Sequence, residues 1–150
     1  KSIDVVVSTE VLEHARNWEP LLAEMVRVLK DDGILVISIP FMYPVHGAPQ
    51  DYRRLTTHGV RQAVEEAGAS VLDVRLFGGL GSILYLPVIG WRYHYISASA
   101  HPATRLVSVM ASPVVLALAP LLNMIATALN RLDKSALYYS QSVTIATRAS

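Results

Sequence analysis

The chain has no cysteine, so it cannot form a disulfide, present a thiol nucleophile or build a zinc site from thiolates. It also has little net charge, because 13 Lys and Arg residues nearly balance 12 Asp and Glu residues, giving +1. There is no overall basic footprint for nucleic acid, so no nucleic-acid partner is predicted. A length of 150 residues is enough for one domain with a sizeable core.

Acidic residues are missing from one long region of the chain. Between Leu76 and Leu132 there is no Asp or Glu, and the charged residues there are Arg92, Arg105 and Arg131. Within this region, residues 106–130 carry no charge at all and would be long enough to span a bilayer.

The first 40 residues show a pattern that predicts a strand, a helix and a second strand. Residues 3–7 and 34–39 are β-branched apolar runs, typical of strands covered on both faces. Apolar residues at helical spacing predict a helix from Trp18 to about Leu29, with Asn17 as its cap and Gly33 ending it. Short connections predict that the two strands are parallel and adjacent, with Ser8 and Pro40 at the same sheet edge.

Three further elements are predicted by the same criteria. They are a helix over residues 57–67 that Gly68 stops, a strand over residues 71–77 and a strand over residues 143–147. Residues 78–81, Gly-Gly-Leu-Gly, lack the full spacing of a phosphate-binding loop, and we interpret them as a turn that lets a helix pack closely. The strand at residues 3–7 is expected at an exposed edge, where a second copy of the chain can pair with it.

One longer pattern is more specific. Residues 8–14, Ser-Thr-Glu-Val-Leu-Glu-His, follow the first strand, then Leu22-x-Glu24-x-x-Arg27-Val-Leu-Lys-x-x-Gly33 precedes a strand that ends in Pro40. This pattern resembles the second half of S-adenosylmethionine-dependent methyltransferases, in particular the large "type 11" group. The resemblance covers residues 1–77 and, by position, the last strand. It implies an α/β fold, namely strands four to seven of a Rossmann-like methyltransferase sheet, the last strand antiparallel, with an apolar helical insertion before it.

The resemblance also implies a division of the chain. Residues 1–77 would form the βαβαβ part of the methyltransferase domain, residues 78–137 the insertion, and residues 138–150 the last strand. In the family, the glycine-rich loop and the acid that holds the ribose lie upstream of these elements. The chain, which begins at Lys1, is therefore expected to be a fragment that by itself binds S-adenosylmethionine weakly or not at all.

The cofactor contacts implied by the resemblance lie in the loop after the first strand. They are Ser8, Thr9, Glu10, Val11 and Leu12, mostly through backbone groups, with Val11 and Leu12 as an apolar flank. The alternative is a plain turn between strand and helix in which Leu12 belongs to the core. Ligands of open parallel sheets bind at the carboxyl ends of the strands, which favours the cofactor interpretation.

The acceptor is expected at a second loop, residues 41–56, which is long and rich in aromatic, His, Asp and Arg residues. The candidate bases are His14 and His46, and the candidate substrate contacts are Tyr43, Asp51, Tyr52 and Arg53. The alternatives are that Asp51 and Arg53 pair or cap the next helix, that Tyr52 only packs, and that His14 makes a local hydrogen bond. Glu10-x-x-Glu13-His14 is not a His-Glu-x-x-His zinc motif, so no metal is predicted.

For residues 106–130 the alternatives stay open. Helices that pack over the sheet or in a subunit interface are one interpretation. A surface seated in the membrane interface is another, supported by the missing acids, the flanking Arg105 and Arg131, and the residues Trp91, Arg92, Tyr93 and Tyr95. A single span is disfavoured because the last strand must return to the sheet.

The resemblance implies an enzyme, a methyltransferase that transfers a methyl group from S-adenosylmethionine to a small-molecule, lipid-linked or glycan acceptor. The predicted location is cytoplasmic, at the inner face of a membrane if residues 106–130 are membrane-facing. The alternative is a non-catalytic module that keeps the fold and associates with a membrane or forms oligomers, through the edge strand or the apolar insertion.

Overall fold

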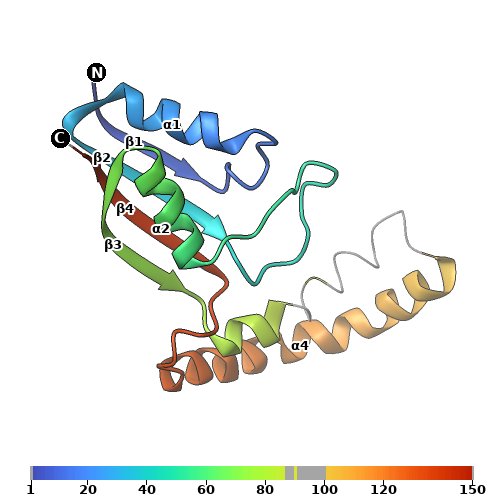
Figure 1. Cartoon of the computed structure of the whole chain (residues 1–150). Coiled ribbons are helices and arrows are strands. Elements are labelled where there is room, and N and C mark those ends of the chain that lie inside the picture. Colours follow the sequence, from blue (N-terminus) through green and yellow to red (C-terminus); the bar gives the residue numbers. More distant parts are fainter. Residues whose placement is uncertain (1, 87–89, 91–100, 150) are drawn as a thin grey trace. The chain divides into compact units, whose positions relative to one another are not determined.

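The computed structural model describes residues 2–86, 90 and 101–149 of the chain. The chain divides into two compact units, residues 1–77 with 140–150, and residues 78–139. The first unit contains a four-stranded sheet and two helices (Figure 1), namely β1 (Ile3–Thr9), α1 (Trp18–Val28), β2 (Leu29–Pro40), α2 (Thr57–Glu66), β3 (Ala69–Phe77) and β4 (Gln141–Arg148). The second unit contains α4 (Pro102–Leu132).

The strand order in the sheet is β1-β2-β4-β3. β1 runs parallel to β2, with Thr9 opposite Ser38, and β4 is antiparallel to both β2 and β3. The predicted parallel pair, the edge position of β1 and the antiparallel last strand are therefore confirmed. Because β1 and β2 are parallel, the loops that follow them start at the same edge of the sheet.

The core lies between the sheet and α1 and α2, which lie on one face of it (Figure 1). Both helices present apolar residues at helical spacing, and the buried positions are Leu22 and Val26 of α1 and Val60 and Val64 of α2. They meet the alternating Leu35, Ile37 and Ile39 of β2, each at most 1% exposed. Burying each such side chain stabilises the fold by about 1.5–3 kcal/mol.

Two predictions about helix ends were wrong. Asn17 makes no side-chain capping bond to α1, and α1 ends at Val28, not through Gly33. Leu29 is already extended (ψ 146°) because it pairs with Ile3 as the first residue of β2.

A Cβ on Gly33 would lie 2.9 Å from Cδ2 of Leu29, so this glycine permits close packing within β2. By contrast, Gly68 (φ 88°) follows the end of α2 as predicted.

In the second unit, the glycine-rich residues 78–81 let a short helix approach α4. A Cβ on Gly81 would lie 2.1 Å from the carbonyl oxygen of Ala126, so only glycine fits. The side chain of Asn130 adds two hydrogen bonds, accepting one from the Ser82 N–H (3.1 Å) and donating one to Ser82 Oγ (2.7 Å). The prediction of a close-packing turn is confirmed.

α4 is unusual in how little of it is covered. Only 6% of its most apolar 18-residue window is buried, and by length and composition alone the helix could cross a membrane. Its exposed large apolar side chains are Leu106, Val107, Val109, Met110, Val114, Leu116, Leu118, Leu121, Met124, Ile125 and Leu132. Trp91, Arg92, Tyr93 and Tyr95, which support the membrane interpretation, lie outside the described residues.

The packing at Gly81 can be tested with one methyl group. We expect Gly81→Ala to destabilise the second unit by about 1–3 kcal/mol, because the added Cβ forces the helix away from α4. Gly90→Ala is the matched control, since a Cβ there meets none of the described residues within 4 Å. Limited proteolysis between residues 78 and 139 measures the effect. Equal cleavage of the two variants would contradict the packing argument.

Candidate active site

The first loop of the site begins with a sharp turn out of β1. Glu10 has a left-handed backbone (φ 52°), and its N–H donates to the carbonyl of Ser38 at 3.2 Å. The hydroxyl of Ser38 donates to Oε1 of Glu10 at 2.6 Å. These two bonds fasten the turn to the end of β2 and direct the following residues away from the sheet. The loop therefore starts at the carboxyl edge, where sheets of this kind bind ligands.

The predicted cofactor residues have different environments. Ser8 is 4% exposed, whereas Thr9 and Val11 are exposed, Val11 by 43%. Leu12 is 1% exposed and belongs to the core, as the alternative interpretation expected for its side chain. Only the backbone of Leu12 remains for a ligand, and its carbonyl already accepts a hydrogen bond from Arg53 (2.7 Å).

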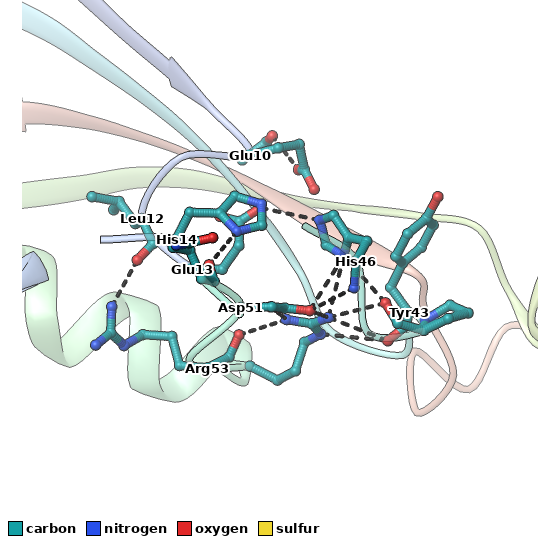
Figure 2. Close-up of polar contacts among 12 residues, drawn as sticks. Glu10, Leu12, Glu13, His14, Tyr43, His46, Asp51 and Arg53 are labelled. Carbon is teal, nitrogen blue, oxygen red and sulfur yellow. Dashed lines mark hydrogen bonds and ion pairs between the residues drawn. The ribbon is translucent and has the colours of Figure 1, made fainter. Parts of the chain in front are cut away.

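The second loop, residues 41–56, folds back on the first and is hydrogen-bonded to it (Figure 2). The N–H of Tyr52 donates to the carbonyl of Glu13 at 2.9 Å, and Nδ1 of His14 lies 2.6 Å from the carbonyl of Gln50. The guanidinium of Arg53 donates to carbonyls of the first loop, those of Leu12, Ala15 and Arg16. Arg53 also lies over the ring of Trp18, at 5.2 Å from its centroid. Arg53 therefore joins the two loops and the start of α1.

Asp51 is buried in the second loop and holds that loop together through hydrogen bonds. Its side chain is 2% exposed and accepts two bonds from the guanidinium of Arg54, at 2.5 and 2.8 Å, and one from the N–H of His46 at 2.8 Å. The bonds from Arg54 hold the pKa of Asp51 well below its usual range. The partner of Asp51 is thus Arg54 and not Arg53.

The two predicted tyrosines line the outside of the loops. Tyr43 is 43% exposed, and its ring packs edge-on against His46, with centroids 5.1 Å apart. Tyr52 is 41% exposed and has the guanidinium of Arg16 at 5.7 Å from its ring centroid. Both side chains are therefore partly accessible from solvent.

The structure brings together three residues that sequence patterns did not group, Glu13, His14 and His46 (Figure 2). Oε1 of Glu13 is 3.8 Å from Nε2 of each histidine, and the two imidazole centroids are 4.9 Å apart. Glu13 is completely buried, and among the described residues neither of its carboxylate oxygens has a hydrogen-bond partner. Burial, and secondarily the negative charge of Glu10, raise the pKa of Glu13. The adjacency of Glu13 and His14 was visible in the sequence, but the proximity of His46 was not.

A cleft also exists on the helical side of the first unit, between α1 and α2. It is lined by Trp18, Glu19, Pro20, Leu22, Ala23, Ala63, Glu66 and Ala67. None of the predicted site residues lines it, so it is not part of the loop site.

Comparison with known proteins agrees with this geometry. Residues 1–37, which contain β1, the first loop, α1 and the start of β2, match the family model described as a methyltransferase domain. The matched segment of this chain is similar to part of a methyltransferase domain. The resemblance to S-adenosylmethionine-dependent methyltransferases is therefore confirmed. No curated protein sequence matches the chain.

Several solved structures have a similar fold over nearly the whole of this chain. The structure of the [4+2]-cyclase SpnF is 17% identical in sequence, with a TM-score of 0.54. The match covers 99% of this chain and 50% of the SpnF chain. An O-methyltransferase of a multienzyme from Brevibacillus brevis is 14% identical, with a TM-score of 0.51, and the match covers 99% of this chain and 45% of that one. The 1,6-didemethyltoxoflavin-N1-methyltransferase from Burkholderia thailandensis is 12% identical, with a TM-score of 0.50, and the match covers 98% of this chain and 44% of that one. At these identities the likeness confirms the Rossmann-like α/β fold. The chain spans about half the length of these structures.

The role of Arg53 in joining the loops gives a stability prediction. Arg53→Lys cannot reach the same three carbonyls, so we expect the free energy of unfolding to fall by about 2 kcal/mol, within the range for hydrogen bonds of a charged group. Urea unfolding followed by circular dichroism measures it.

Arg61→Lys on α2 is the matched control, because Arg61 is exposed and its guanidinium forms a loose surface ion pair with Glu65, with Nη1 and Oε1 3.8 Å apart. A surface pair of this kind contributes about 0–1 kcal/mol. If both variants unfold at the same urea concentration, Arg53 does not hold the loops together.

Proposed function

We propose that the protein transfers a methyl group from S-adenosylmethionine to a small-molecule, lipid-linked or glycan acceptor, and that this chain supplies part of the cofactor site and the acceptor side. The observation that carries the proposal is the loop at the carboxyl end of β1, which lies within the matched methyltransferase segment. The neighbours from Brevibacillus brevis and Burkholderia thailandensis contain S-adenosylhomocysteine, which supports the same cofactor here.

Methyl transfer from a sulfonium is an in-line displacement, which requires chiefly that cofactor and acceptor be held close and aligned. On the cofactor side, we assign the backbone of residues 8–12 to the methionine part of the cofactor, with exposed Val11 as an apolar flank. The left-handed turn at Glu10 supports this assignment, because it opens the backbone away from the sheet.

On the acceptor side, His14 and His46 are the candidate bases. The nearest partner of each Nδ1 is a carbonyl, that of Gln50 for His14 (2.6 Å) and that of Pro44 for His46 (3.1 Å). A proton on Nδ1 satisfies these carbonyls and leaves Nε2 free to accept a proton from an acceptor hydroxyl. Tyr43 and Tyr52 supply exposed rings beside them. For Asp51 and Arg53, contact with the acceptor stays a prediction, because both already hold the loops.

Cofactor binding by the complete protein tests the proposal. We expect S-adenosylhomocysteine to bind in calorimetry, and Glu10→Ala to weaken it about tenfold, because the turn loses its bond to Ser38. Glu19→Ala, an exposed change in the first turn of α1, should leave the affinity unchanged. A complete protein that does not bind S-adenosylhomocysteine would reject methyl transfer and favour the non-catalytic module.

We also propose that α4 contacts a membrane, which would place the protein in the cytoplasm at the inner face of a membrane and suits a lipid-linked acceptor. The exposed apolar side chains of α4 support this, since soluble surfaces rarely carry so many together. Each buried Leu, Val or Met contributes at most about 1.5–3 kcal/mol, and each basic residue near anionic lipid, such as Arg105, about 1 kcal/mol.

Co-sedimentation of the complete protein with anionic liposomes tests the membrane contact. We expect replacement of Met110, Val114 and Leu121 by Gln to abolish co-sedimentation, because these side chains are 48–71% exposed on α4. The same change at Val45 and Leu72, which are 77% and 60% exposed in the first unit, should have no effect. Absence of the wild-type protein from the liposome pellet would leave α4 as a protein interface.

A further inference from the structure

We propose that Glu13, His14 and His46 bind one divalent transition-metal ion, with zinc as the ion that fits best. This inference goes beyond the proposed methyl transfer. It concerns the cluster itself and does not depend on the cofactor or the acceptor.

The first argument is the state of Glu13. Its carboxylate is 0% exposed, and among the described residues neither oxygen accepts a hydrogen bond from another residue; the nearby backbone N–H of Glu13 itself lowers the pKa of the group only in part. Burying an ionised carboxylate without a partner is unfavourable, so such a group is protonated, paired with a cation or bound to a metal. The imidazoles at 3.8 Å are too far away to donate a normal hydrogen bond. A cation between Glu13 and the two rings would remove this cost.

The second argument is the orientation of the imidazoles. Each presents Nε2 to Glu13, while its Nδ1 has a carbonyl as nearest partner, that of Gln50 or Pro44. Histidines that ligate metals donate their other ring N–H to such an acceptor, which fixes the tautomer and the ring orientation. The contact to Gln50 is short for His14. Nδ1 of His46 also lies 3.5 Å from Oδ2 of Asp51 and 3.4 Å from Nη2 of Arg54, and the shorter contact to Pro44 and the carboxylate of Asp51 favour a proton on Nδ1.

The third argument is distance. The three ligand atoms all lie within 4.8 Å of one another. Ligands about 2.0–2.1 Å from a tetrahedral zinc are separated by roughly 3.4 Å, so small side-chain rotations close the site. The backbone also lets the loops meet, because Gly47 has a left-handed conformation (φ 65°) and a Cβ there would lie 3.0 Å from Cε1 of His14.

The donor set indicates the metal and its use. Two imidazoles and one carboxylate suit zinc, and three protein ligands leave a fourth position open, as catalytic zinc sites do. His14 and His46 are 29% and 32% exposed, so this position can face solvent or an acceptor. With the ion bound, each Nε2 would be a ligand and could not act as a base, so under the proposed function the ion would replace the histidines as the group that activates the acceptor. A hydroxyl bound there would lose its proton to solvent more readily. Its oxygen would then bond to the methyl carbon as the carbon–sulfur bond breaks.

Metal binding is tested on the complete protein after treatment with a chelator. We expect ZnCl₂ to bind in calorimetry with one ion per chain and to raise the melting temperature, whereas MgCl₂ does neither, because Mg²⁺ prefers oxygen ligands. Glu13→Gln, His14→Ala and His46→Ala should each weaken zinc binding at least tenfold. His58→Ala, an exposed histidine on α2, is the matched control and should bind as the wild type.

Near-ultraviolet circular dichroism of each variant verifies that the fold is kept. The rise in the melting temperature of the wild type with ZnCl₂ tests metal binding even if a variant fails to fold. The proposal is overturned if the wild type binds no zinc, or if the three variants bind it as tightly as His58→Ala. Binding of S-adenosylhomocysteine by the metal-free protein separates the two proposals, since it tests the cofactor site without the metal.

Discussion

The parallel pairing of β1 with β2 is the constraint on which the site depends. Because Thr9 lies opposite Ser38, the loops after both strands leave the sheet at one edge. The turn at Glu10 is then fastened to the end of β2 by two hydrogen bonds, and the second loop can reach back to the first. An antiparallel arrangement of the same strands would put these loops at opposite ends of the sheet and separate His14 from His46.

The two loops carry many polar groups, and the structure satisfies them unequally. Arg53 and Arg54 use their guanidinium groups on backbone carbonyls and on Asp51, so the chain around the site is held in one arrangement. Inside this frame Glu13 is left buried and without a hydrogen bond among the described residues. A buried carboxyl group that no hydrogen bond from a neighbouring residue satisfies reduces stability, and sites with that property are commonly functional.

The two units of the chain differ in what they do with apolar residues. In the first unit, the apolar residues of α1, α2 and β2 cover one another and form the core. In the described part of the second, Gly81 packs closely against Ala126, and the large apolar side chains of α4 are exposed. The apolar residues therefore form a core in one unit and, in the other, a surface suited to an apolar partner.

The sequence by itself determined the elements and their order. Apolar runs and helical spacing predicted every strand and both helices of the first unit, and the short connections predicted the parallel pair, because these patterns are local. The end of α1 was missed because Leu29 is drawn into β2 by pairing with Ile3, a contact 26 residues away. The partner of Asp51 and the carbonyl contacts of Arg53 also depended on how the second loop folds. Only the tertiary structure could place His46 beside Glu13 and His14, because residues 32 positions apart meet through the path of two loops and not through any local pattern.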